Sequence, residues 1–309
     1  MSTPVINVRG LVKEYGRTRA LDGLALEVAA GEVFGFIGPN GAGKSTTIRV
    51  IMDLLRPTAG EVTVFGRAPS DGGPALRTRI GYLPGELAFR GRGSAHEHLA
   101  HLASLRGGRG RDQIAPLAER FGLELARPVR ALSKGNRQKV GVIQAFMHEP
   151  ELLVLDEPSS GLDPLLQHEF IELVRERAAR GATVFMSSHV LREVESVADR
   201  VAVIRSGRTV DVDSVSSLRR RAGQRVSLRF ATAPDLTDFA ELPGVEQARL
   251  DGDTLHCLLH GEPDGLFKRA ARHHVTAWSA RDRDLEEMFL DVYRLAENGE
   301  DAAEVRHAR

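Results

Sequence analysis

The sequence has little cysteine and no long hydrophobic run, and each shortage excludes a class of protein. Cys257 is the only cysteine, so an internal disulfide and a cysteine-based metal cluster are both excluded. No stretch approaches the ~20 apolar residues that a membrane-spanning helix needs. The segment from Met1 to Pro4 lacks the basic-then-apolar pattern of a signal peptide. We therefore expect a protein that is made and kept in the cytoplasm.

The sequence also lacks an excess of charge of either sign, because Lys+Arg and Asp+Glu both number 42 among 309 residues. No global charge points to nucleic acid or anionic lipid, and no direct contact with nucleic acid is expected. Lysine is scarce beside arginine. Because lysine is scarce, a lysine at a motif position is less readily explained by chance. The lysines are Lys13, Lys44, Lys134, Lys139 and Lys268.

A complete G-x-x-x-x-G-K-S/T phosphate loop follows the apolar run from Val33 to Ile37. Its glycines let backbone N–H groups point at phosphate oxygens, Lys44 reaches the outer phosphates, and Ser45 can offer its hydroxyl to Mg²⁺. The residues that follow, to Met52, have the apolar spacing of a helix. A glycine-rich turn between two core elements is the alternative, and the match of both motif and context disfavours it. The loop and the next residue are Gly38, Pro39, Asn40, Gly41, Ala42, Gly43, Lys44, Ser45 and Thr46.

Two further apolar runs end in polar residues. The run from Leu152 to Leu155 precedes Asp156, which would hold the Mg²⁺ shell, and Glu157, which could polarise an attacking water. The run from Val184 to Met186 leads to His189. Structural capping or a surface ion pair is the alternative for Glu157 and His189. Their positions after apolar strands at one sheet edge favour function.

A third segment, Leu132-Ser133-Lys134-Gly135-Asn136, opens an amphipathic helix that runs through Phe146. Ser133 suits the N-cap of that helix. The start of such a helix can aim a hydroxyl, backbone N–H groups and a dipole at an anion. The phosphate loop of the same chain, however, already has its own helix.

Together these segments resemble the nucleotide-binding subunit of ABC transporters, from about Val5 to Arg208. The resemblance implies an α/β fold, a P-loop NTPase core with a parallel sheet and an inserted helical subdomain. It implies that Lys44, Glu157 and His189 are catalytic, with Glu157 as general base and His189 as a switch histidine near the γ-phosphate. ATP and Mg²⁺ are the implied cofactors, and Ser45 and Asp156 are the implied metal ligands.

The resemblance also implies how the nucleotide is shared between chains. Tyr15 would stack on adenine, and the segment from Ser160 to Asp163 would join two sites. Family members form head-to-tail homodimers that sandwich ATP, in which Ser133 and Gly135 of one chain complete the site of its partner. One chain alone should hydrolyse ATP poorly.

Two departures from the family pattern concern the signature segment and the glutamine that usually touches Mg²⁺. Lys134 and Asn136 stand where glycine and glutamine are usual, but the small groups that approach the phosphate are kept. Gly85 stands where the glutamine is expected. Glu86 or a water would then have to replace that glutamine, which puts the coupling to the membrane subunit in question.

The chain is expected to have two domains. Residues 1–214 form the ABC ATPase domain, with a helical subdomain at about 87–148, and residues 215–309 form a small C-terminal accessory α+β domain with a polar tail. The second domain shows strands, an Asp251-Gly252-Asp253 hairpin signal and a helical stripe, but no chemistry of its own. The stripe is read as a core-packing face, with a partner groove as the alternative. Its residues are Leu285, Met288, Phe289, Val292 and Tyr293.

The segment from Asp284 to Phe289 resembles the tails of type-2 export ATPases, including antibiotic exporters. We therefore expect the ATP-hydrolysing subunit of a two-component exporter, working on the inner face of the cell membrane with a separate permease that sets specificity. The alternatives are a soluble ABC ATPase acting on ribosomes or DNA and a low-turnover nucleotide sensor. The first usually carries two cassettes or a long coiled coil, which this chain lacks, and Gly85 makes the second credible.

Three other features have simpler explanations. His96, His98 and His101 lack a carboxylate or cysteine to complete a metal set. The run from Arg106 to Arg111 has no interleaved aromatics and is read as a solvated linker rather than a nucleic-acid contact. Cys257 is read as a buried strand thiol.

Overall fold

The computed structural model describes residues 3–89 and 93–283, which fall into two compact units. The first unit runs to Asp213 and the second begins at Ser214. The helical stripe and the polar tail expected after residue 283 lie outside the described residues.

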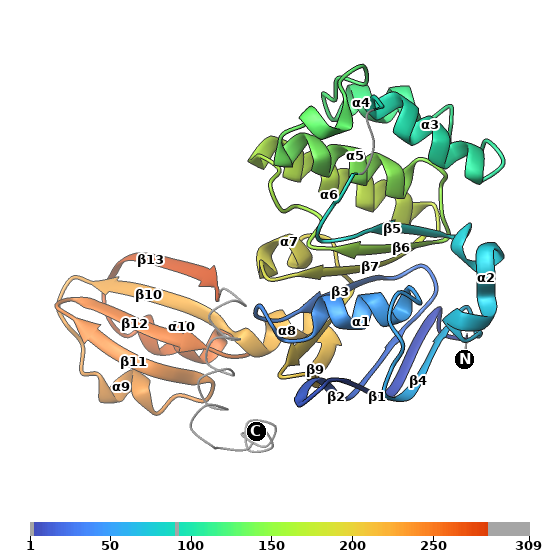
Figure 1. Cartoon of the computed structure of the whole chain (residues 1–309). Coiled ribbons are helices and arrows are strands. Elements are labelled where there is room, and N and C mark those ends of the chain that lie inside the picture. Colours follow the sequence, from blue (N-terminus) through green and yellow to red (C-terminus); the bar gives the residue numbers. More distant parts are fainter. Residues whose placement is uncertain (1–2, 90–92, 284–309) are drawn as a thin grey trace. The chain divides into compact units, whose positions relative to one another are not determined.

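The centre of the first unit is a six-stranded sheet with the strand order β5-β6-β7-β3-β8-β9 (Figure 1). The pairs β5 with β6, β6 with β7, β7 with β3, and β3 with β8 are parallel. Every residue of β3 and β6 is buried, as expected for a parallel sheet that is covered on both faces. The bounds are β3 Val33–Ile37, β5 Ile80–Leu83, β6 Leu152–Asp156, β7 Thr183–Ser188, β8 Arg200–Arg205 and β9 Arg208–Ser214.

A smaller antiparallel sheet, in the order β2-β1-β4, belongs to the same unit. Helix α1 (Lys44–Ile51) lies between the two sheets (Figure 1). Its buried Ile48 shares one apolar cluster with Phe36 of the large sheet and Leu24 of the small one. The helix that begins at the phosphate loop is thus held on both sides. The remaining bounds here are β1 Ile6–Tyr15, β2 Thr18–Val28, β4 Ala59–Val64 and α2 Pro69–Arg77.

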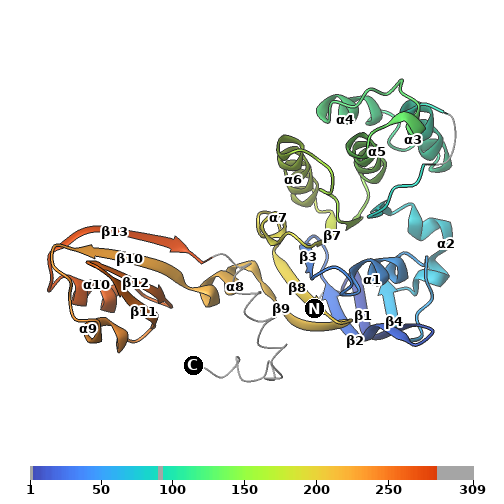
Figure 2. The same ribbon diagram turned by 60° about the vertical axis from the view of Figure 1, so that its left-hand side comes forward.

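Helices α5 and α6 lie on the opposite side of the parallel sheet from α1 in both views (Figures 1 and 2). A capping box formed by Ser94 and Glu97 begins α3, and Ser133 caps α5 as predicted. Gly81 of β5 allows α5 close approach, since a Cβ there would lie 2.1 Å from the carbonyl oxygen of Ala145. The bounds are α3 Ala95–Leu105, α4 Ile114–Arg120, η1 Val129–Ala131, α5 Lys134–Phe146, α6 Pro164–Ala179 and α7 Leu191–Glu195.

The second unit is an antiparallel sheet, β11-β12-β10-β13, with α9 and α10 packed on one face. Leu228, Phe239 and Leu266 meet in its core. Asp251-Gly252-Asp253 forms the predicted hairpin, and Cys257 is buried, which raises the pKa of its thiol to about 11. The bounds are α8 Val215–Ala222, β10 Gln224–Phe230, α9 Thr237–Ala240, β11 Val245–Asp251, β12 Thr254–Leu259, α10 Asp264–Ala270 and β13 Val275–Asp282.

The two units together confirm the predicted fold class. The first is an α/β core with a parallel sheet and helices inserted between β5 and β6, and the second is a small α+β unit. Helices α8 and α9 were not predicted.

Candidate functional site

The phosphate loop connects β3 to α1 at the carboxyl end of β3. Gly41 and Gly43 take left-handed backbone angles, with φ of 81° and 110°, a conformation that costs glycine little. Gly38 is required for a different reason, since a Cβ there would lie 2.4 Å from the carbonyl oxygen of Ile204. Each of these glycines therefore has a local steric reason. The loop can present its backbone to a ligand.

Lys44, the first residue of α1, is buried within the loop that precedes it. Its side chain is only 6% exposed, and its Nζ donates to the carbonyl oxygens of Gly38 at 2.6 Å and Pro39 at 3.3 Å. Its third polar neighbour is the carboxylate of Glu157, with 3.2 Å between Nζ and Oε1. The loop, α1 and the end of β6 thus meet at one ammonium group.

Asp156 ends β6, Glu157 directly follows it, and both are bonded to Ser187 of the neighbouring strand. Ser187 is fully buried, and its hydroxyl donates to Asp156 Oδ1 at 2.7 Å. The Glu157 N–H donates to both the hydroxyl and the carbonyl oxygen of Ser187, at 3.2 Å each. This contact follows from the parallel register, in which Asp156 stands opposite Ser187.

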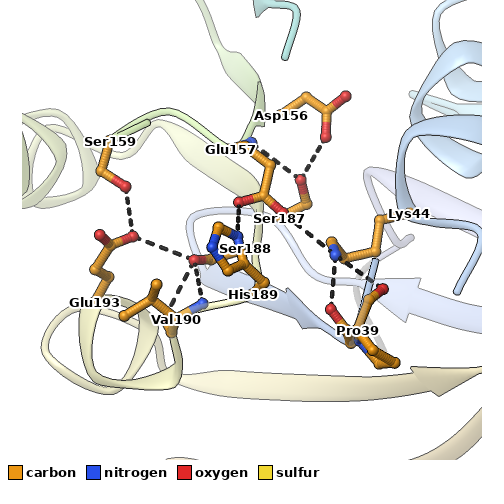
Figure 3. A network of polar contacts seen from close by, with 11 residues as sticks. Pro39, Lys44, Asp156, Glu157, Ser159, Ser187, Ser188, His189, Val190 and Glu193 are labelled. Carbon is orange, nitrogen blue, oxygen red and sulfur yellow. Dashed lines mark hydrogen bonds and ion pairs between the residues drawn. The ribbon is translucent and has the colours of Figure 1, made fainter. Parts of the chain in front are cut away.

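The Glu157 carboxylate is shared between a lysine and a histidine (Figure 3). While Oε1 faces Lys44, Oε2 accepts a hydrogen bond from Nδ1 of His189 at 2.5 Å. Glu157 also has a φ of 49°, an uncommon value for a residue other than glycine. Backbone strain of this kind gathers at functional positions. Through the contacts described above, the structure brings Lys44, Asp156, Glu157 and His189 together at one edge of the parallel sheet.

Gly85 lies against Asp156. A Cβ on Gly85 would stand 3.1 Å from Asp156 Oδ2, whereas Glu86 is exposed. Burial, reinforced by the nearby Asp156 charge, raises the pKa of Tyr82 to about 12, so this phenol stays neutral. One oxygen of Asp156 is thus bonded to Ser187, and the other faces a glycine backbone.

Tyr15 and the signature segment lie outside this network. Tyr15 ends β1, is 46% exposed, and has the Lys13 ammonium 5.4 Å from the centre of its ring. Ser133 is exposed at the start of α5, where its side chain accepts from the Asn136 N–H. A Cβ on Gly135 would lie 2.8 Å from the carbonyl oxygen of Gly161, so the signature segment packs against the loop after β6.

Several polar groups of the site were not predicted from the sequence. Besides Ser187, they are Gln138, which donates to the carbonyl oxygen of Pro158 at 2.7 Å, and Glu193, which accepts from Ser159 at 2.5 Å. A signal existed for Ser187, because a polar residue at the end of an apolar strand is suited to an active edge. For Gln138 and Glu193, 20 and 34 residues from their partners, no local pattern exists.

The histidine cluster lies on α3, and the arginine run lies in the turns that follow that helix. Among the described residues, no group of three or more His, Cys, Asp or Glu could hold a metal ion. The Nε2 of His98 lies 3.3 Å from Gln144 Oε1. The arginine run forms turns between α3 and α4, as a linker does.

The site combines a glycine-rich loop, the buried Lys44 ammonium group, a carboxylate suited to a hard metal ion and a carboxylate suited to accept a proton. These are the parts that phosphoryl transfer to water requires. Within residues 3–89 and 93–283, no helix is long and apolar enough to span a bilayer.

Comparisons with known proteins agree with this chemistry. The ABC transporter family model matches residues 21–160. The chain is 39% identical to the daunorubicin/doxorubicin resistance ATP-binding protein DrrA of Streptomyces peucetius, over 93% of this chain and 92% of that one. It is 33% identical to a fluoroquinolones export ATP-binding protein of Mycobacterium tuberculosis, over 94% of each chain.

A solved ATP-binding subunit of an ABC transporter superposes with a TM-score of 0.66 and 32% identity, over 70% of this chain and 92% of that one. The two relatives match this chain along nearly their whole length. The chain belongs to the ABC transporter family, as an ATP-binding subunit with ATPase activity.

Proposed function

We propose that this chain powers a two-component export system by hydrolysing ATP beneath a separately encoded membrane permease. The observation that carries the proposal is the sharing of the Glu157 carboxylate between Lys44 and His189 at the end of the parallel sheet. The names of the relatives, which specify anthracycline resistance and fluoroquinolone export, support an antibiotic-like substrate.

The residues that would contact ATP and the attacking water have separate roles in this proposal. Lys44 and the loop from Gly38 to Thr46 neutralise and orient the phosphates of ATP, which are already charged in the ground state. Glu157 accepts the proton of the attacking water as the transition state forms. His189 orients the Glu157 carboxylate and stands beside the γ-phosphate. Tyr15, exposed at the end of β1, stacks on adenine.

Ser45 and Asp156 would hold Mg²⁺, and their chemistry fits this ion. Hard cations prefer oxygen ligands, and Asp156 keeps one oxygen that no side chain of residue 85 covers. The ion would neutralise the charge that develops on the phosphate oxygens. The Ser187 hydroxyl donates to the other oxygen and so helps to orient the carboxylate.

The signature segment serves a second copy of the chain. Ser133 and Gly135 are absent from the network around Lys44 in the described residues, yet their helix start is exposed and suited to an anion. In a head-to-tail homodimer they complete the partner's site, with the loop from Ser160 to Asp163 between the two. Hydrolysis then requires two chains.

The remaining proposals concern placement. Residues 1–214 act as the ATPase domain and residues 215–309 as an accessory domain. The chain works at the inner face of the membrane, where it would contact its membrane-spanning permease. Specificity for the exported compound resides in the permease.

Co-purification tests the export proposal. The chain is co-expressed with a neighbouring gene whose product has several hydrophobic spans of membrane length, and the complex is isolated from detergent-solubilised membranes. We expect a complex whose presence lowers cellular accumulation of an antibiotic, and Glu157→Gln should form the complex without lowering accumulation. Association with ribosomes or DNA, and none with the membrane protein, would support the soluble ABC ATPase instead.

A further inference from the structure

One carboxylate oxygen joins the two loops that carry the reacting side chains. Glu193 Oε2 accepts from the Ser159 hydroxyl at 2.5 Å and lies 3.2 Å from the Ser188 hydroxyl, whose single proton it shares with the Val190 carbonyl oxygen, also at 3.2 Å (Figure 3). Ser159 follows Glu157 by two residues, and Ser188 directly precedes His189. The contact therefore ties the loop after β6 to the end of β7.

Both serines are held away from solvent, so their hydrogen bonds are not surface contacts. Ser159 is 9% exposed and Ser188 is 1% exposed. The Ser188 hydroxyl also accepts from the Val190 N–H at 2.9 Å, which shapes the turn that contains His189. A buried hydroxyl that loses its acceptor is costly. Without the Glu193 carboxylate, Ser159 would lose the acceptor of its 2.5 Å bond, whereas Ser188 would keep the Val190 carbonyl oxygen. The Ser159 bond is therefore the main tie between the two loops.

The helix that carries Glu193 is itself fixed to the sheet. In α7, Leu191 and Val194 are buried. Val194 fills the space above Gly35 of β3, since a Cβ on Gly35 would lie 2.0 Å from Val194 Cγ1. Glu193 thus projects from a backbone that is anchored beside the strand leading into the phosphate loop.

We propose that Glu193 is a positioning residue for hydrolysis, which holds Glu157 and His189 at the separation that their contact requires. The proposal rests on the roles proposed above for those two residues. Glu193 touches neither of them in the described structure and acts through Ser159 and Ser188. Small displacements of positioned groups lower turnover far more than they lower ground-state binding.

The geometry predicts which substitutions are tolerated. Because both hydrogen bonds end on the same oxygen, the single carbonyl oxygen of glutamine can accept both. Alanine accepts neither, and aspartate is shorter by one methylene. The order of activity should therefore be wild type, then Glu193→Gln, well above Glu193→Asp and Glu193→Ala.

The test is ATPase turnover and ATP-analogue affinity of the full chain, with Glu172→Gln as the control. Glu172 lies partly exposed on α6 and pairs with Arg175. We expect Glu193→Ala to lower kcat about tenfold or more while binding stays within about twofold. Glu193→Gln should keep most of the activity, and Glu172→Gln should match wild type.

Ser159→Ala keeps the proposal testable if Glu193→Ala does not fold. The single variant Ser159→Ala should lower kcat. In the double variant with Glu193→Ala, the loss of kcat in free-energy terms should be smaller than the sum of the losses in the two single variants. Full activity of Glu193→Ala, or equal loss in Glu193→Gln and Glu193→Ala, would overturn the proposal. Glu157→Gln distinguishes failure of the proposed function from failure of the inference about Glu193. If Glu157→Gln hydrolyses ATP like wild type, the proposed general base is wrong. If Glu157→Gln is inactive while Glu193→Ala is active, only the inference about Glu193 fails.

Discussion

Ser187→Ala removes the group that orients the metal-facing carboxylate and leaves the rest of the sheet edge in place. The hydroxyl lost is fully buried and donates to Asp156 Oδ1 at 2.7 Å. The Glu157 N–H keeps a partner in the carbonyl oxygen of Ser187, so the cost falls on Asp156. A hydrogen bond to a charged group contributes about 1.5–3 kcal/mol. We therefore expect the free energy of unfolding of the first unit to fall by about 2 kcal/mol.

Thermal unfolding and a Mg²⁺ titration of ATPase activity measure the two consequences. The midpoint should fall by about 4–8 °C for a unit of this size, and half-saturation should need several-fold more Mg²⁺ because Asp156 loses its fixed orientation. Ser70→Ala is the matched control, since Ser70 donates to Asp71 Oδ1 at 2.9 Å in an exposed position. If Ser187→Ala unfolds at the same temperature as Ser70→Ala and keeps the wild-type Mg²⁺ dependence, the reasoning is refuted.

Three other predictions follow from the described contacts. MgATP should turn Glu157→Gln into a stable dimer, measured by size-exclusion chromatography with light scattering. Adding Ser133→Arg should abolish that dimer because the guanidinium would occupy the space of the partner's γ-phosphate. A dimer that Ser133→Arg leaves unaffected would mean that the chains associate through another interface. Glu86→Ala should leave the steady-state ATPase rate nearly unchanged because Glu86 is exposed. Gly85→Gln, in contrast, should change the Mg²⁺ dependence of that rate. A large loss of activity in Glu86→Ala that excess Mg²⁺ rescues would show that Glu86 replaces the glutamine usual at position 85 in the family. Burial, with a smaller contribution from nearby arginine, lowers the pKa of His148 from 6.5 to about 4. Between these two pH values the unfolded chain binds a proton that the folded chain does not, so the free energy of unfolding should fall by at most about 3 kcal/mol as the pH drops from 6.5 to 4. Urea unfolding at pH 7 and pH 5 should therefore show a smaller difference in unfolding free energy for His148→Asn than for wild type.

Patterns confined to one segment predicted most of the elements. The apolar runs from Val33 to Ile37 and from Leu152 to Leu155 lie in fully buried strands, because a covered parallel strand needs apolar residues on both faces. Ser133 caps its helix because its side chain accepts from the N–H of Asn136, the third residue of that helix. These features depend on neighbours within a few residues.

Contacts between distant segments were beyond the reach of those patterns. The bond from Ser187 to Asp156 spans 31 residues and depends on the register of β6 and β7. Neither partner's local sequence encodes that register. Glu193 was missed for the same reason, and the pairing of β1 with β4 likewise depends on tertiary packing.

Nucleotide binding and turnover, measured together in Lys44→Ala and Glu157→Gln, test the central claim that one network binds and hydrolyses ATP. Equilibrium titration with a fluorescent ATP analogue should show lost affinity in Lys44→Ala, because the buried ammonium neutralises phosphate charge already present in the ground state. Glu157→Gln should retain affinity and lose phosphate release, because its carboxylate acts only as the transition state forms. Equal loss of affinity in both variants, or full turnover in Glu157→Gln, would contradict the account.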